Sequence, residues 1–146
     1  MGDMELRKIE YGTPAYEETI DLRNEYFRKP QGMDIRNEDL TGDAKVNMYG
    51  GYIDDCLMAT VFYAEKDRAT AQVKALIVDE KYQGQGYGKY LMNFIEGLIR
   101  EKGYKKAILQ GRVSAQGLYE KLGYVPTSEV FDYNTIPHLW MEKDLK

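Results

Sequence analysis

The sequence is poor in the residues that build disulfides, cysteine-ligated metal sites and membrane spans. Its 146 residues include one cysteine, Cys56, and one histidine, His138. A single cysteine can form no intrachain disulfide and supports no cysteine-based zinc site. No apolar run approaches the ~18 residues of a membrane-spanning helix, and the chain opens without an apolar signal segment. We therefore expect a soluble, cytoplasmic protein with no membrane partner and no metal.

A strong positive charge is also missing. The chain has 20 basic and 24 acidic residues, a formal net charge of −4, which argues against a nucleic-acid partner. The charge is uneven, because residues 81–121 hold eight bases and three acids, so that this stretch carries +5 and the remainder −9. A basic stretch in an acidic protein favours a local anionic ligand, although a solvated helix face would give the same pattern.

Length and composition indicate one folded unit. At roughly 100–200 residues per domain, a chain of 146 residues predicts a single domain over residues 1–146, long enough to bury one core. The hydrophobic fraction of 43% is typical of globular proteins, and no repeat or linker interrupts the chain.

The first half of the chain predicts a helix followed by three antiparallel strands. Thr13 and Pro14 suit the N-cap and first position of a helix, which ends near Lys29 because Pro30 disfavours helical backbone before it. Asp54 and Asp55 suit a hairpin turn. The expected elements are a strand over 5–11, this helix, a short helical piece over 37–40, and strands over 46–53, 56–64 and 69–78.

The second half predicts a strand–helix–strand crossover. Leu91, Phe94, Ile95, Leu98 and Ile99 recur at the spacing of one buried helix face. A strand over 104–109 follows, which makes a parallel crossover with the strand before the helix. Gly103 ends this helix, Gly123 ends a second helix over 114–122, and two last strands cover 124–133 and 138–143. The class is α+β with a mixed sheet.

Three alternating glycines precede the periodic helix. Gly84, Gly86 and Gly88 can adopt positive φ and let the backbone approach an anion, and the N–H groups of the helix start point at such a ligand. The P-loop pattern fails because Tyr90 stands where Ser or Thr is required, and the dinucleotide fingerprint fails because Lys89 replaces its third glycine. A nucleotide-binding regulatory domain is thus disfavoured, and a plain tight turn is the alternative to phosphate binding.

Two segments carry a family resemblance. Residues 83–88 resemble the [R/Q]-x-x-G-x-[G/A] acyl-CoA loop of the GNAT superfamily of N-acetyltransferases, and residues 115–124 are similar to its A-x-x-F-Y-x-K-x-G-F segment. Residues 22–32 and 136–143 further resemble the ElaA-like and YjcF-like bacterial branch. The resemblance implies a GNAT-type α+β fold, with a mixed, mostly antiparallel central sheet flanked by helices.

The resemblance also implies an activity. The chain is expected to be an acetyl-CoA-dependent N-acetyltransferase that acts on a primary amine of a small molecule or peptide, by direct attack in a ternary complex. Tyr119 would donate a proton to the departing thiolate, and a homodimer would be in keeping with the family. The residues implied to bind the cosubstrate are Leu76, Ile77, Val78, Gln83, Gly84, Gln85, Gly86, Tyr87, Gly88 and Lys89.

The general base stays open at this stage. Deprotonating an amine with a pKa near ~10.4 costs roughly 4.6 kcal/mol at pH 7, so a base is expected. Glu129, Asp132 and His138 are the nearest candidates. Arg112 stands where the family often has an asparagine that contacts CoA, and it could reach a phosphate, a pantetheine carbonyl or solvent.

The acceptor and the route also leave alternatives. Acidic residues near the expected acceptor region would suit a cationic amine; they are Glu38, Asp39, Glu129 and Asp132. A ping-pong route through Cys56 lacks an activating His or Asp motif. From a different functional class, the chain could be a catalytically silent module that binds CoA or a protein partner.

Overall fold

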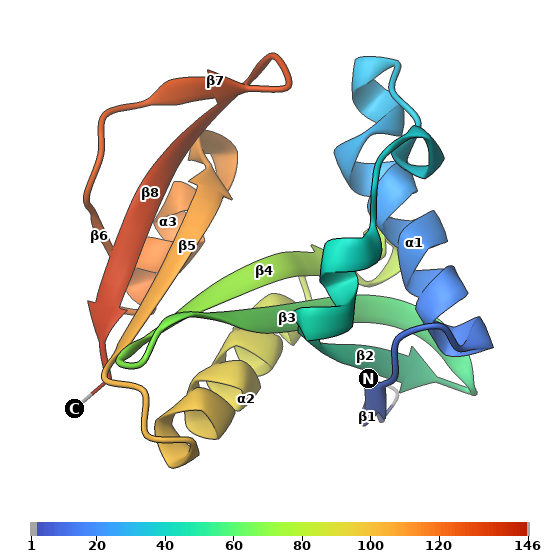
Figure 1. The fold of residues 1–146 in the computed structure, drawn as a ribbon, viewed down its shortest axis with the longest axis horizontal. Coiled ribbons are helices and arrows are strands. Elements are labelled where there is room, and N and C mark those ends of the chain that lie inside the picture. The colour runs from blue at the N-terminus through green and yellow to red at the C-terminus, as the bar shows by residue number, and fades with distance from the viewer. Residues whose placement is uncertain (1–2, 146) are drawn as a thin grey trace.

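A single eight-stranded sheet forms the centre of the computed structural model, which describes residues 3–145 (Figure 1). The strands follow the order β1-β2-β3-β4-β5-β8-β6, and β7 pairs with β8. All pairs are antiparallel except β4 with β5. This confirms the α+β class and the mixed, mostly antiparallel sheet. The strands are β1 (Glu5–Ile9), β2 (Asn47–Ile53), β3 (Cys56–Asp67), β4 (Thr70–Val78), β5 (Lys106–Arg112), β6 (Val125–Pro126), β7 (Phe131–Tyr133) and β8 (Ile136–Asp144).

Helices flank this sheet and begin and end close to the predicted signals. The Thr13 hydroxyl oxygen accepts a hydrogen bond from the Tyr16 N–H at 3.2 Å, which confirms the N-cap. Gly103 and Gly123 adopt φ angles of 94° and 98° just past the second and third helices, as a glycine stop requires. The α-helices are α1 (Pro14–Phe27), α2 (Tyr87–Glu101) and α3 (Gln116–Lys121), and the 3-10 turns are η1 (Lys29–Gln31), η2 (Ile35–Asn37), η3 (Thr41–Lys45), η4 (Glu80–Tyr82) and η5 (Val113–Ala115).

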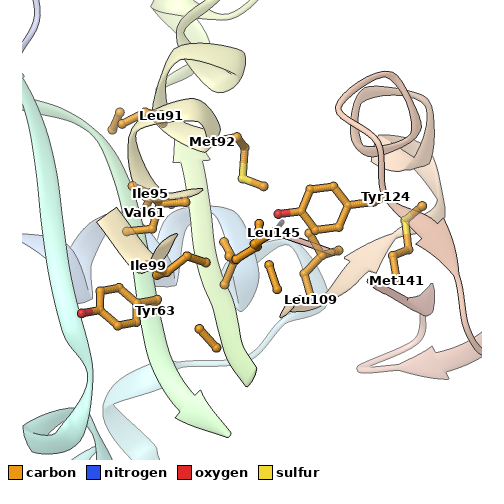
Figure 2. Close-up of a cluster of buried hydrophobic side chains, with 14 of the residues drawn as sticks. Val61, Tyr63, Leu91, Met92, Ile95, Ile99, Leu109, Tyr124, Met141 and Leu145 are labelled. Carbon is orange, nitrogen blue, oxygen red and sulfur yellow. The ribbon is translucent and has the colours of Figure 1, made fainter. Parts of the chain in front are cut away.

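Helix α2 packs its apolar stripe on one face of the sheet (Figure 2). Leu91, Ile95 and Ile99 are fully buried there, and Figure 2 shows Ile95 beside Val61 and Ile99 beside Tyr63 of β3. Full burial of one such side chain contributes roughly 1.5–3 kcal/mol. The stripe therefore fixes where α2 begins, and with it the position of the glycine loop.

Helix α1 covers the opposite face with a second, smaller core. Tyr16 and Ile20 of α1 are buried with Met48 of β2 and Phe62 of β3. Ile35 of η2 closes this cluster, and its backbone N–H donates to the Asn24 side chain at 2.8 Å. In Figure 1 the C-terminal end of α1 extends past β4, away from β1, β2 and β3.

Two sequence-based expectations are wrong in their extent. The expected strand over 124–133 is split into β6 and β7, because Pro126 has no N–H for a ladder and the Trp140 N–H of β8 donates instead to the Ser128 hydroxyl at 2.9 Å. The expected helical piece over 37–40 is replaced by η2 and η3 on either side of it.

Strand β4 carries the irregularity that shapes the site. It pairs with β5 only over residues 70–73, and then the two strands diverge. Ala75 has a left-handed φ of 51° at the point where the register with β3 shifts. The Thr60 hydroxyl donates to the Ala75 carbonyl oxygen at 2.7 Å and holds this bulge. Within the described part of the chain, the edge of residues 76–78 that faces β5 has no strand partner.

Candidate active site

The diverging strands β4 and β5 open onto a cavity of about 620 Å³, within the range of small-molecule sites. Its walls come from the C-terminal end of α1, from β4 and β5, from the start of α3 and from the β7–β8 hairpin. Five of the predicted site residues line it: Leu76, Ile77, Val78, Gln83 and Tyr119. Elements from both halves of the sequence therefore line this one cavity.

Tyr119 of α3 stands against the backbone of β5. A Cβ added at Gly111 would lie 2.9 Å from Cε2 of Tyr119, so the missing side chain at 111 makes room for the ring. Burial raises the pKa of Tyr119 to about 12, and the positive charge of Arg112 opposes that rise. The phenol is thus a protonated donor at the cavity wall at neutral pH.

The glycine loop lies just beyond the end of β4. Gly84 and Gly86 have φ angles of 78° and 90°, and a Cβ at either would meet nothing within 4 Å. Glycine is therefore needed here for backbone conformation rather than for packing. Gly86 is the N-cap of α2 and carries no side-chain acceptor, and the start of a helix presents backbone N–H groups that suit an anion.

The remaining loop residues divide into buried and exposed ones. The Gln83 side-chain amide donates to the Val78 carbonyl oxygen at 2.9 Å, which ties the loop to β4 and uses one of its two amide hydrogens. Tyr87 is buried, with its ring edge-to-face against Tyr82 at 6.1 Å. Lys89 is exposed. Gly84, Gln85, Gly86, Tyr87, Gly88 and Lys89 are not among the residues that line the cavity.

Arg112 reaches across the cavity from the end of β5 to the end of α1. Its Nη2 donates to the Tyr26 carbonyl oxygen at 2.8 Å, and its guanidinium lies 5.5 Å from the centre of the Phe27 ring. Partial burial lowers its pKa, although a guanidinium stays charged. Among residues 3–145 it forms no ion pair with a carboxylate.

His138 also lines the cavity, from β8 and directly opposite Arg112 in the β5–β8 register. Its Nδ1 lies 2.8 Å from the Ile136 carbonyl oxygen. A carbonyl only accepts, so Nδ1 carries the hydrogen in the neutral ring and Nε2 has the free lone pair. Phe131 stacks on the ring at 6.4 Å and Tyr133 meets it edge-on at 5.5 Å. The other two base candidates, Glu129 and Asp132, are exposed and do not line the cavity.

The acids expected near the acceptor region do not reach the cavity. Glu38 pairs with Arg28 at 2.6 Å, and Asp39 accepts from Thr41 at 2.7 and 3.0 Å. None of the four expected acids lines the cavity. Cys56 is exposed at the β2–β3 turn and does not line it either.

The cavity does contain one carboxylate that sequence reasoning missed. Asp43 of η3 is buried, and its Oδ2 accepts from the Tyr16 hydroxyl at 2.7 Å and from Arg23 Nη1 at 2.8 Å. No local pattern marks this residue, because both partners lie on α1, at least 20 residues away in sequence. Its charge is already neutralised by Arg23.

Comparison with known proteins identifies the family. The model of the acetyltransferase (GNAT) domain matches residues 45–145. The chain is 34% identical to the uncharacterised Bacillus subtilis protein YyaT over 76 residues, about half of each chain. It is 28% identical to ElaA of Escherichia coli over 115 residues, covering 77% of this chain and 74% of ElaA.

Solved structures share the whole fold. The crystal structure of Escherichia coli ElaA superposes with a TM-score of 0.78 at 24% identity, covering 97% of this chain and 99% of ElaA. An aminoglycoside 6'-N-acetyltransferase crystallised with coenzyme A gives a TM-score of 0.79 at 16% identity, covering 97% of both chains. No helix within residues 3–145 is both long and apolar enough to cross a membrane. The solved structures share the fold, and the family model over residues 45–145 shows that the chain belongs to the GNAT family of acetyltransferases.

Proposed function

We propose that this protein transfers the acetyl group of acetyl-CoA to a primary amine by direct attack in a ternary complex. The observation that carries the proposal is the meeting of an unpaired β4 edge, residues 76–78, with the Tyr119 phenol at one cavity. A relative of the same fold was crystallised with coenzyme A. The cavity has room for both an acyl chain and an amine.

The cosubstrate would lie along β4 and end at the glycine loop. The backbone of Leu76, Ile77 and Val78 would pair with the pantetheine amides, as an edge strand pairs with a peptide. The N–H groups from Gln83 to Lys89 would hold the pyrophosphate at the start of α2. Residues 83–86 are exposed, and the positive φ angles of Gly84 and Gly86 let the backbone approach an anion closely. Both observations support this placement.

Tyr119 would act as the general acid. The amine nitrogen attacks the thioester carbonyl carbon, an N–C bond forms, and the C–S bond breaks as the tetrahedral intermediate collapses. The leaving sulfur takes the phenolic proton, and the phenolate regains a proton from the newly acylated nitrogen. The raised pKa of Tyr119, about 12, keeps this proton in place until the thiolate forms.

His138 would act as the general base. Nδ1 is committed to the Ile136 carbonyl oxygen, so Nε2 is the atom that can accept a proton from the substrate ammonium. The two flanking rings, Phe131 and Tyr133, limit rotation of the imidazole. Direct attack also needs no protein thiol, which agrees with the place of Cys56 outside the cavity lining.

The test combines binding with turnover. Calorimetry should show CoA and acetyl-CoA binding with Kd near the micromolar range, and much weaker ATP and NAD binding. With a panel of amines, thiol release should give intersecting initial-rate patterns, and Cys56→Ala should keep full activity. Parallel lines would indicate a ping-pong route, and tight CoA binding without turnover would favour the silent module. A cytoplasmic location and a homodimer stay predictions.

A further inference from the structure

The cavity is lined by more positively than negatively charged side chains. Four cationic side chains line the cavity, against one carboxylate; the cations are Arg23, Arg28, Lys74 and Arg112, and the carboxylate is Asp43. The whole chain has a net charge of −4, so the excess of positive charge in this cavity is opposite in sign to the net charge. It indicates a ligand with negative charge.

Two of these cations are already neutralised. Arg23 Nη1 pairs with Asp43 at 2.8 Å, and Arg28 Nε pairs with Glu38 at 2.6 Å. Arg28 Nη1 also donates to the Phe27 carbonyl oxygen. The charge of each guanidinium is therefore already balanced by a carboxylate.

Arg112 is different. Its guanidinium has five N–H donors, of which one, on Nη2, binds the neutral Tyr26 carbonyl oxygen. Partial burial makes a cation without an anion costly, yet no carboxylate of the described chain pairs with it. Lys74 of β4 lines the same cavity and is also without an ion pair among residues 3–145.

The position of Arg112 argues against a contact with the phosphates of CoA. Arg112 Nη2 binds the end of α1, and its guanidinium is near enough to Tyr119 for its charge to oppose the rise that burial causes in the pKa of the phenol. Of the proposed pyrophosphate site, from Gln83 to Lys89, only Gln83 lines the cavity. An anionic group held by Arg112 would therefore belong to the acceptor and not to the pyrophosphate.

We infer that the acceptor is a primary amine that also carries an anionic group, a carboxylate or a phosphate, held by Arg112 with Lys74 while its amine faces the thioester. The inference rests on the proposed acetyl transfer. It replaces the idea of a purely cationic amine, for which the cavity offers only the neutralised Asp43.

Matched acceptor pairs test this directly. Specificity, kcat/KM, is measured for β-alanine against propylamine, for phosphoethanolamine against ethanolamine, and for putrescine. We expect an anionic member to exceed its neutral partner by about tenfold or more, the scale of a charge-assisted hydrogen bond. The preferred pair tells carboxylate from phosphate. A preference for neutral amines or for putrescine would overturn the inference.

Variants locate the effect. Arg112→Gln should bring the anionic-to-neutral ratio close to one, Arg112→Lys should restore part of it, and Arg68→Gln, an exposed arginine in the β3–β4 turn, should leave it unchanged. An unchanged ratio in a folded Arg112→Gln variant would contradict the inference, as would a loss of rate equal for all amines.

The affinity for CoA separates this inference from the proposed function. It is measured by calorimetry on the same variants. A Kd within about threefold of wild type is expected, because the phosphates bind elsewhere; a large loss would assign the anion to CoA and overturn the acceptor class alone. Absence of CoA binding in the wild type would overturn the acetyl transfer itself.

Discussion

The backbone N–H of Glu80 donates a hydrogen bond of 2.7 Å to the Tyr26 hydroxyl, joining residues 54 positions apart. Glu80 begins η4, the turn between β4 and the glycine loop, and Tyr26 lies in the last turn of α1. The same tyrosine offers its carbonyl oxygen to Arg112 of β5. One residue of α1 thus contacts both the turn that follows β4 and the end of β5.

Loss of the Tyr26 hydroxyl should loosen the glycine loop. Tyr26→Phe removes one hydrogen bond, worth about 0.5–1.5 kcal/mol, and leaves the ring and the carbonyl in place. We expect the Kd for CoA to rise about three- to tenfold in calorimetry, with a small fall in Tm. Tyr11→Phe, at an exposed tyrosine, is the control. An unchanged Kd would mean that this bond does not order the loop.

Gly86→Val should abolish CoA binding without unfolding the chain. At a φ of 90° a β-branched residue is strained, and its side chain would fill the open space beside the loop, where the pyrophosphate is proposed to bind. We expect the Kd to rise at least about 100-fold, while the far-UV circular dichroism is retained.

Gly97→Ala is the matched control. Gly97 lies inside α2, and an added Cβ would meet nothing within 4 Å. It should raise stability by about 0.5–1 kcal/mol, because alanine is the better helix former, and leave the Kd unchanged. If both variants bind CoA like wild type, Gly86 serves only the turn.

Local signals in the sequence predicted the helices and strands more completely than they predicted the candidate active site. The spacing of Leu91, Ile95 and Ile99 predicts α2 because the residues of one buried face recur at the helical period. Thr13 marks a helix start because its side chain caps the helix, and Gly103 marks a helix end because glycine readily adopts a positive φ. Each of these signals acts within a few residues of the chain.

The shape of the cavity escaped sequence reasoning because it depends on distant partners. The bulge at Ala75 depends on a hydroxyl 15 residues away, and alanine gives no sign of a positive φ. Arg112 meets α1 across 86 residues. The contact between Nδ1 of His138 and the carbonyl oxygen of Ile136 depends on the folded β7–β8 hairpin, which the sequence alone does not define. The glycine loop and Tyr119 were assigned from the resemblance, and their roles stay predictions.

His138→Gln should lower kcat/KM more at pH 7 than at pH 10. Glutamine keeps polar contacts in the hairpin but cannot take up a proton, so the ammonium must lose its proton to water. We expect about a 100-fold loss at pH 7, the low end for positioned proton transfer. The deficit should shrink toward pH 10, where the free amine is abundant.

The pH profile separates catalysis from packing. Tyr119 does not complicate it, since burial raises its pKa to about 12 and the phenol stays protonated over this range. Arg112, opposite on β5, keeps its charge throughout, and Phe131 does not titrate. A deficit of equal size at every pH would make His138 a packing residue between Phe131 and Tyr133.

An ion pair between α2 and β8 should contribute to the stability of the fold and not to catalysis. Lys143 Nζ of β8 lies 2.6 Å from Glu96 Oε1, and the Tyr124 hydroxyl donates to Oε2 at 3.1 Å. Lys143→Met leaves the buried Glu96 charge with the Tyr124 hydroxyl but without a cation, which should cost about 3–5 kcal/mol in urea unfolding. The double variant Glu96→Leu, Lys143→Met should recover most of the loss. Equal losses in both variants would contradict this account.

The most direct test of the account is single-turnover acetyl transfer by Tyr119→Phe. The ring and its contact with β5 at Gly111 remain, and only the proton donor is lost. We predict a rate lower by roughly 10²–10⁴-fold, a Kd for CoA within about tenfold of wild type, and a stability change of no more than about 1–2 kcal/mol. A rate equal to that of wild type would contradict the central claim, because the thiolate would then obtain its proton from solvent or another group.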